Sequence, residues 1–205
     1  KVFKMNILVT GGAGYLGSIL VPELLHVGHK VTVLDNFMFN QTSLNQLCIY
    51  PNFEIFNGDI RDFKFVDYVF RTAKKNGHNI EGVIHFAGLK SVKESFYKPF
   101  LYWDVNVEGT RNLIRVMDKF KCFNLIFSSS ATVYGNVSNP PIKENCKVNP
   151  NNFYGFTKSK AENLIEKFYL KNKPKCSAII LRYFNPIGNN EYGIIGERFN
   201  SNTNN

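Results

Sequence analysis

The chain has 205 residues, of which 44% are hydrophobic and 20% charged, so it is long enough to bury one substantial core. No stretch approaches the roughly 20 apolar residues of a membrane span, and no secretory signal opens the chain, so we expect a cytoplasmic protein without membrane contact. The formal net charge is +9, but Lys and Arg are spread along the chain rather than gathered into a stripe, which argues against a nucleic-acid partner.

The cysteines and the chain ends carry further expectations. We expect neither a zinc or other metal site nor a disulfide framework, because no CxxC pair occurs and the four cysteines are scattered as Cys48, Cys122, Cys146 and Cys176. The sequence begins with Lys1, a natural first strand follows Met5, and a polar run from Asn200 to Asn205 ends it. We therefore expect a fragment of a longer protein.

Apolar β-branched and aromatic runs alternate with amphipathic stretches along the chain. This pattern predicts strands near residues 6–10, 31–34, 53–56, 82–86, 124–128 and 178–183, with helices near 15–27, 62–76, 104–120 and 154–171. Because each helix is long enough for a right-handed crossover, the fold class is α/β, a doubly wound parallel sheet of Rossmann type. Ligands bind such sheets at the carboxyl ends of the strands, so residues that follow the strands are the functional candidates.

A glycine-rich turn directly follows the first strand. Its GxxGxxG spacing suits a dinucleotide pyrophosphate, since the glycines allow close backbone approach and the following helix offers free N–H groups. The motif Thr10-Gly11-Gly12-Ala13-Gly14-Tyr15-Leu16-Gly17 is weak alone, but its place between a strand and an apolar helix strengthens it.

Two carboxylates follow the second and third strands. Asp35 can accept hydrogen bonds from ribose hydroxyls and would repel a 2′-phosphate, which favours NAD over NADP, although Asp35 and Asn36 could also simply cap a loop. Asp59, in Gly58-Asp59-Ile60-Arg61-Asp62, is a candidate partner for an adenine amino group, and an Asx turn is the alternative.

A tyrosine and a lysine lie four residues apart where the fourth helix begins. Tyrosine is a poor base at its ordinary pKa near 10, so Tyr154 needs a neighbouring ammonium group, which Lys158 can supply from the same helix face. Strand-end hydroxyls in Phe127-Ser128-Ser129-Ser130 lie at the same edge. The equally spaced pair Tyr169 and Lys173 lies at the far end of the helix and is interpreted as surface.

Two other features have ordinary structural interpretations. His85 is expected to be a strand-end residue packed against the next helix. The aromatic segment 96–103 could suggest base stacking, but its basic residues do not alternate with its rings, so we interpret it as a turn that packs over the cofactor edge.

Taken together, the motifs TGGAGYLG, GDIRD, HFAGLKSV, NVEGT, FSSSATVYG, YGFTK and RYFNPIG resemble the extended short-chain dehydrogenase/reductases of the NAD-dependent epimerase/dehydratase type. Within that family HFAGLK, SSSATVYG and RYFNPIG are most similar to UDP-glucose 4-epimerases. The resemblance covers most of the chain and implies an NAD-binding domain over residues 1–185, the opening of a truncated substrate domain over 186–205, and a homodimer in the full-length protein.

The resemblance also implies roles for individual residues. It makes Tyr154 the base, Lys158 the group that lowers the pKa of that tyrosine, and Ser130 a partner of the reacting hydroxyl. The residues it assigns to the cofactor are Gly11, Gly14, Tyr15, Leu16, Gly17, Asp35, Asn36, Asp59, Ile60, Phe86, Ala87, Gly88, Lys90, Asn106, Tyr154, Lys158 and Tyr183. Those it assigns to the substrate are Lys90, Ser130, Tyr154, Asn185 and Asn205.

The implied reaction is redox-neutral inversion at C4 of a UDP-sugar, interconverting UDP-glucose and UDP-galactose through a 4-keto intermediate. Related 4,6-dehydratases carry an Asp-Glu pair after the strand-end hydroxyl, where this chain has Ala131 and Thr132, so dehydration is not expected. The segment 37–43 looks more like other sugar-nucleotide members, which leaves another NAD-dependent sugar-nucleotide epimerase/dehydratase as an alternative. An inactive NAD-binding fragment or a regulator is the second alternative.

Overall fold

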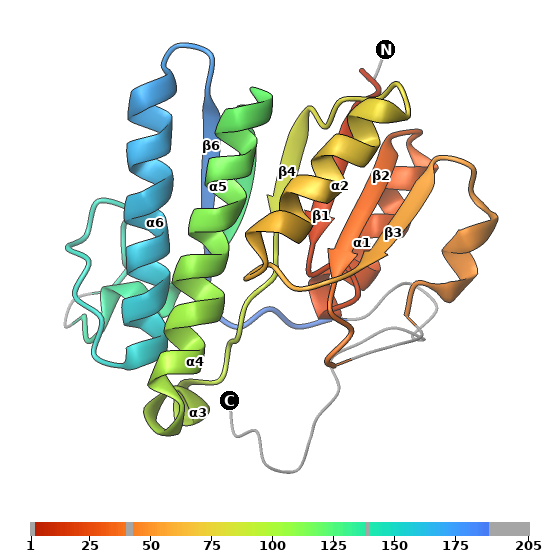
Figure 1. Cartoon of the computed structure of the whole chain (residues 1–205). Coiled ribbons are helices and arrows are strands. Elements are labelled where there is room, and N and C mark those ends of the chain that lie inside the picture. The colour runs from red at the N-terminus through yellow and green to blue at the C-terminus, as the bar shows by residue number, and fades with distance from the viewer. Residues whose placement is uncertain (1–2, 40–42, 138–139, 189–205) are drawn as a thin grey trace.

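The computed structural model describes residues 3–39, 43–137 and 140–188. A six-stranded parallel sheet forms its centre, with the strand order β3-β2-β1-β4-β5-β6 (Figure 1). The strands are β1 (Asn6–Thr10), β2 (Lys30–Asp35), β3 (Phe53–Asn57), β4 (Gly82–His85), β5 (Asn124–Ser130) and β6 (Ser177–Tyr183). The prediction of a doubly wound Rossmann-type sheet is confirmed, and the predicted strands agree with these bounds to within two residues.

Helices connect the strands and cover both faces of the sheet. The α-helices are α1 (Tyr15–His26), α2 (Phe63–Lys75), α3 (Val92–Tyr97), α4 (Pro99–Trp103), α5 (Gly109–Phe120) and α6 (Phe153–Asn172). Short 3₁₀ turns form η1 (Asn45–Ile49) and η3 (Ala131–Tyr134), and a π-helical turn forms η2 (Asp104–Glu108). Among the described helices, none is long and apolar enough to cross a membrane.

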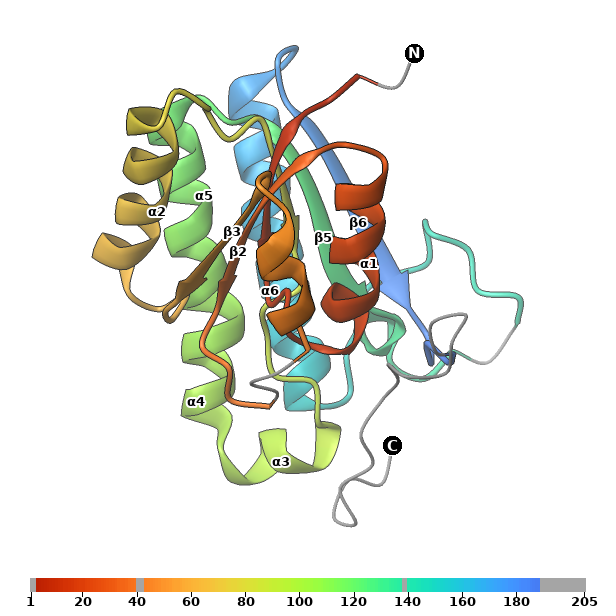
Figure 2. The ribbon, with the colours of Figure 1, turned by 90° about the vertical axis from the view of Figure 1, so that its right-hand side faces the viewer.

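Alternate side chains of the central strands enter two separate cores, as the period of a strand requires, whereas the edge strand β6 packs Ala178 and Ile180 against one core and exposes Ile179 and Leu181. Leu8 belongs to the core under α2, α5 and α6, whereas its neighbours Ile7 and Val9 pack under α1 and η1. Figure 2 shows this division edge-on, with α1 on one side of the sheet and α2 and α5 on the other. The predicted parallel arrangement therefore rests on burial of both faces.

Side-chain caps fix where two of the crossover helices begin. The Asp62 carboxylate accepts from the amides of Lys64 and Phe65 at 2.9 and 3.1 Å, and Asn152 accepts from the amide of Gly155 at 2.8 Å. Each bond satisfies a donor that the first helical turn leaves unpaired. The Asn152 cap matters for the site, because it sets the point at which α6 begins just before Tyr154.

The aromatic segment 96–103 differs from its prediction. It is not a turn, because α3 and α4 occupy it and meet at Lys98. Ser91 caps α3 by accepting from the Glu94 amide, and Pro99 is the first residue of α4, a position where its missing N–H costs nothing. Tyr102 from this segment is fully buried and packs edge-on against the Tyr154 ring, with ring centroids 6.5 Å apart.

Candidate active site

A cleft opens at the carboxyl ends of β1, β2, β3 and β4, where the chain path reverses direction across the sheet. Connections from β1 and β4 leave toward opposite faces at this point, which is where open α/β sheets bind ligands. The cleft is lined by Gly11, Ala13, Gly14, Leu34, Asp35, Asn36, Met38, Phe39, Gly58, Asp59, Ile60, Arg61, Phe86, Ala87, Gly88, Leu89 and Val105. Nine of the predicted cofactor residues are in that set.

Gly11 shows why the turn after β1 needs glycine. Its φ is +72°, a left-handed conformation that costs an L side chain free energy, and a Cβ atom here would lie 2.5 Å from the backbone nitrogen of Ala87. Its amide donates to the Leu34 carbonyl oxygen at 2.9 Å, which holds the turn against β2. The backbone therefore passes so close to the end of β4 that no side chain fits between.

The positive end of α1 follows this turn. The first helical hydrogen bond runs from the Ser18 amide to the Gly14 carbonyl oxygen at 2.8 Å. The preceding amides of Tyr15, Leu16 and Gly17 lie before that bond, at the end of a helix where backbone N–H groups favour an anion. Gly14 and the turn before it line the cleft, so this end of α1 is adjacent to it.

Asp35 ends β2 and is fixed by the backbone on both sides. Its Oδ2 accepts from the Ala13 amide at 2.9 Å and its Oδ1 from the Phe37 amide at 2.7 Å. Burial raises the pKa of Asp35, and these two hydrogen bonds oppose that rise. The bond to Phe37 is a local loop cap, and the bond to Ala13 ties the carboxylate to the glycine turn, so it is a preformed acceptor in the cleft.

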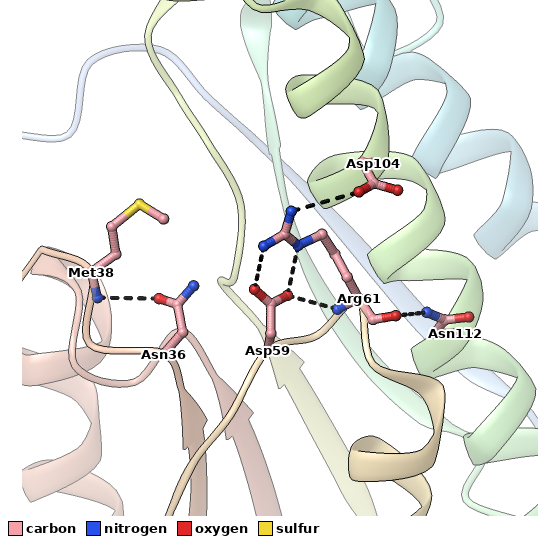
Figure 3. A network of polar contacts seen from close by, with 6 residues as sticks. All are labelled: Asn36, Met38, Asp59, Arg61, Asp104 and Asn112. Carbon is pink, nitrogen blue, oxygen red and sulfur yellow. Dashed lines mark hydrogen bonds and ion pairs between the residues drawn. The ribbon is translucent and has the colours of Figure 1, made fainter.

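Asp59 forms an ion pair at the same edge, drawn in Figure 3. Its Oδ1 accepts from the Arg61 amide at 2.8 Å, which is the Asx turn that was the alternative for this residue, and the Arg61 guanidinium donates to both carboxylate oxygens. Arg61 also reaches Asp104 at 3.6 Å and accepts at its carbonyl oxygen from Asn112 at 2.8 Å. The hydrogen bond from Arg61 lowers the pKa of Asp59, which keeps its carboxylate ionised.

Tyr154 is buried at the start of α6. Its backbone amide donates to the Ser95 hydroxyl at 3.1 Å, so α3 fixes the place where the helix begins. Burial raises the pKa of the Tyr154 phenol, and a hydrogen bond with Ser130 opposes this by lowering it. A phenol in this setting needs a nearby positive charge to lose its proton near neutral pH.

Lys158 supplies that charge. Its ammonium nitrogen lies 6.0 Å from the centroid of the Tyr154 ring and donates to the Ser128 carbonyl oxygen at 2.9 Å. Burial lowers the pKa of Lys158 to about 8, and the negative charge of Glu162 raises it. A Cβ atom on Gly88 would lie 3.3 Å from this nitrogen, so Lys158 also lies beside the cleft.

The remaining predicted residues end or follow strands β4, β5 and β6. Asn106 is buried in η2, and Ser130 caps η3 by accepting from the Thr132 amide. Tyr183 ends β6, Asn185 beyond it is exposed, and Asn205 lies outside the described residues.

Eight predicted cofactor residues are not among those that line the cleft in the described part of the chain: Tyr15, Leu16, Gly17, Lys90, Asn106, Tyr154, Lys158 and Tyr183. The Tyr15 hydroxyl donates to the Gly188 carbonyl oxygen at 2.7 Å, and partial burial lowers the pKa of Lys90. The predicted packing of His85 is confirmed, because its ring contacts Thr10 at 2.7 Å and Thr110 of α5 at 3.0 Å. Of the second tyrosine-lysine pair, Lys173 is exposed as predicted, whereas Tyr169 is half-buried and packs against the core.

Sequence reasoning missed several residues of the cleft wall: Ala13, Leu34, Met38, Phe39, Gly58, Arg61, Leu89 and Val105. Arg61 carried a usable signal, because a basic residue two positions after a strand-end aspartate can close an Asx turn with its side chain. The others are apolar or small, and their type gives no hint of a site.

A parallel sheet in this order, a glycine turn into α1, an acidic residue ending β2 and a buried tyrosine-lysine pair together define a dinucleotide-binding Rossmann-type protein. The chain belongs to the NAD dependent epimerase/dehydratase family, whose model matches residues 7–203.

The relatives to which the chain is similar include UDP-glucose 4-epimerases. The chain is 46% identical over 205 residues to the enzyme of Haemophilus influenzae, covering 98% of this chain and 59% of that protein. It is 41% identical over 198 residues to UDP-glucose 4-epimerase 2 of Oryza sativa, covering 94% and 47%. The chain thus spans about half the length of the curated relatives it matches.

Solved structures of UDP-glucose 4-epimerases are also similar to the chain. The UDP-glucose-4-epimerase of Stenotrophomonas maltophila, with bound NAD and formylated UDP-arabinopyranose, matches at a TM-score of 0.88 and 35% identity, over 98% of this chain and 59% of that one. The Bifidobacterium longum UDP-glucose 4-epimerase in complex with NAD⁺ and UDP matches at 0.83 and 37% identity, over 94% and 57%.

Proposed function

We propose that this chain is the NAD-binding and catalytic portion of an enzyme that inverts C4 of a UDP-sugar, interconverting UDP-glucose and UDP-galactose. The observation that carries the proposal is the cluster of Tyr154, Lys158 and Ser130 at the strand edge beside the cleft. The relatives named above, which are UDP-glucose 4-epimerases, support it.

The cleft fits NAD by its own geometry. At Gly11 a Cβ atom would collide with the Ala87 backbone, so only glycine allows the tight turn after β1, and the N-terminus of α1, which favours an anion such as a pyrophosphate, follows directly. Asp35 is fixed with acceptor capacity to spare, since a carboxylate offers about four lone-pair sites and two amides occupy one each. Its charge disfavours a 2′-phosphate, which supports NAD rather than NADP.

The catalytic residues would divide the work around one sugar hydroxyl. NAD held in the cleft would supply reversible hydride transfer with the sugar carbon. Tyr154 removes the proton from the 4-hydroxyl and gives it back, while Ser130 hydrogen-bonds the same oxygen. Lys158 carries a positive charge below its pKa of about 8 and so stabilises the tyrosine anion at neutral pH.

The same edge supports epimerisation over dehydration. Loss of water needs an acid and a base just after the strand-end hydroxyl. Ala131 and Thr132 occupy those positions, and the Thr132 hydroxyl is already bonded to Ser130 at 2.9 Å. Neither side chain can act as a carboxylate acid-base pair.

We also propose the organisation expected from the sequence. Residues 1–185 form the NAD-binding domain, residues 186–205 begin a substrate domain, and the full-length protein is a homodimer. The competing function, a regulator that binds NAD without catalysis, needs the glycine turn but no tyrosine-lysine pair. The burial of Tyr154 and Lys158 beside the cleft favours the enzyme.

The test joins cofactor release to turnover. The purified full-length protein is denatured and the supernatant assayed for NAD, and native full-length protein is then supplied with UDP-galactose while UDP-glucose is followed. We expect bound NAD and turnover, with Tyr154→Phe abolishing turnover and retaining NAD. Bound NAD in a folded protein that turns over no UDP-sugar would contradict the enzymatic proposal.

A further inference from the structure

Glu162 is a buried carboxylate that the proposed chemistry does not use. It lies on α6 two turns beyond Tyr154 and one turn beyond Lys158, on the same helix face. Its side chain is 7% exposed, in a place where an unpaired charge would be costly. It therefore needs partners, and these come from two strands.

Arg182 of β6 is the first partner. Its Nε and one terminal nitrogen donate to the two carboxylate oxygens at 3.0 and 2.8 Å, and its other terminal nitrogen donates to the Tyr134 hydroxyl at 2.8 Å and the Glu144 carbonyl oxygen at 3.0 Å. Hydrogen bonding to Glu162 raises the pKa of Arg182. One guanidinium thus joins β6, α6 and the turn after β5.

Ser129 of β5 is the second partner, and its position in the strand is informative. Its hydroxyl donates to Glu162 Oε1. The residue before it, Ser128, accepts from Lys158 through its carbonyl oxygen, and the residue after it, Ser130, bonds Tyr154. Three consecutive residues of β5 are therefore fastened to three residues at successive turns of α6.

The charges around Lys158 come from few groups. On its own helix it faces Tyr154 and the anionic Glu162, and His85 of β4 is uncharged at neutral pH because burial lowers its pKa to about 3. Arg182 is bound to the Glu162 carboxylate. Among these groups Glu162 is the anion that favours the charged form of Lys158.

We propose that Glu162 is a positioning residue, which through Ser129 and Arg182 locks the end of β5 to α6 and holds Lys158 as an ammonium ion facing Tyr154. The catalytic meaning of this role rests on the proposed function, but the arrangement itself does not. Glu162 touches neither the reacting groups nor the cleft, so it acts through Lys158.

The test measures the titration of Lys158 directly. Protein labelled with ¹³C at the lysine ε carbon is titrated by NMR, and the Lys158 signal is identified by its absence in Lys158→Met. Glu162→Gln should lower the midpoint of Lys158 by about one pH unit, because the neighbouring anion is gone. Glu166→Gln is the matched control, since Glu166 lies one turn further along α6 and is exposed. The Lys158 midpoint in this variant should equal that of the wild type.

A second variant covers a folding defect in Glu162→Gln, which leaves Arg182 without its anion. The double variant Glu162→Gln/Arg182→Met replaces the ion pair by neutral groups, which buried sites tolerate better than a lone charge. It should also show a lowered Lys158 midpoint. A folded variant of either kind with a wild-type midpoint overturns the proposal, and so does loss of folding in both, which would make Glu162 a stability residue only.

The titration needs neither NAD nor a sugar, so the two proposals fail separately. A wild-type protein without turnover would refute the enzymatic function and leave the Lys158 midpoints to decide the role of Glu162. An unchanged midpoint in an active protein would refute the positioning role alone.

Discussion

Asn106 and Leu89 are joined by a pair of hydrogen bonds in which a side-chain amide takes the place of a neighbouring strand. The Leu89 amide donates to Asn106 Oδ1 at 2.8 Å, and Asn106 Nδ2 donates to the Leu89 carbonyl oxygen at 3.0 Å. The same Nδ2 donates to Thr157 of α6 at 3.0 Å. The loop after β4 and the residue before Lys158 are thereby held by one side chain.

Replacing Asn106 by Ala should therefore destabilise the protein. The change leaves the buried amide and carbonyl of Leu89 without partners, and we expect a loss of about 2 kcal/mol in the free energy of unfolding. Asn112→Ala is the control, because Asn112 donates to the Arg61 carbonyl oxygen at an exposed position, where about 0.5 kcal/mol is expected. Urea unfolding checks both, and equal losses would contradict the role given to Asn106.

The sheet could be predicted from sequence because its strands are short apolar runs that turn signals separate. Segment 92–103 shows where such reasoning fell short. Ser91 and Glu94 have the S-x-x-E spacing of a helix start, and Pro99 is typical of a first helical residue. Both helices could therefore have been predicted, but the aromatic residues of the segment were interpreted as a turn. The π-helical turn that carries Asn106 has no such signature.

The candidate site likewise contains residues that could be predicted from sequence and residues that could not. Gly11, Asp35 and the Tyr154-Lys158 pair could be found because their chemistry requires fixed spacings next to strand ends. Glu162 could not be singled out, because a glutamate on a helix is ordinarily exposed. Its burial depends on Arg182, a partner 20 residues away on another strand, which becomes visible only in the folded chain.

Gly11→Ala should abolish retention of NAD and destabilise the protein by more than about 2 kcal/mol. The new methyl group would face both left-handed strain and collision with the Ala87 backbone. Gly77→Ala separates these causes, since Gly77 has a φ of +79° but no atom within 4 Å of an added Cβ, so about 1 kcal/mol is expected there. Urea unfolding and assay of released NAD provide the comparison, and a Gly11→Ala protein that matches Gly77→Ala in both would refute the close-approach argument.

Asp35→Asn should reduce discrimination between NAD and NADP by about tenfold or more. The amide keeps an acceptor oxygen for one of the two backbone amides but removes the charge that repels a 2′-phosphate. Calorimetric titration of both cofactors into cofactor-free protein measures the ratio. Asp118→Asn serves as control, because Asp118 pairs with Lys171 near the far end of α5, and its ratio should not change. If Asp35→Asn kept the wild-type ratio, Asp35 would not be the group that selects the cofactor.

His85 should make the protein less stable as the pH falls. Burial, followed by the charge of Lys158, lowers the pKa of His85 to about 3, whereas an unfolded histidine titrates near 6.5. Above pH 6.5 both states are neutral and the stability is fully present. Between pH 6.5 and about 3 the unfolded state binds a proton that the folded state does not, at up to about 1.4 kcal/mol per pH unit.

His85→Gln removes this titration while keeping groups that can bond Thr10 and Thr110. The difference in unfolding free energy between wild type and variant should therefore move by about 2 kcal/mol in favour of the variant from pH 8 to pH 5, measured by urea unfolding. Parallel curves for wild type and His85→Gln would show that the pKa of His85 is the same in the folded and the unfolded protein, which would contradict the lowering expected from its burial between β1 and α5.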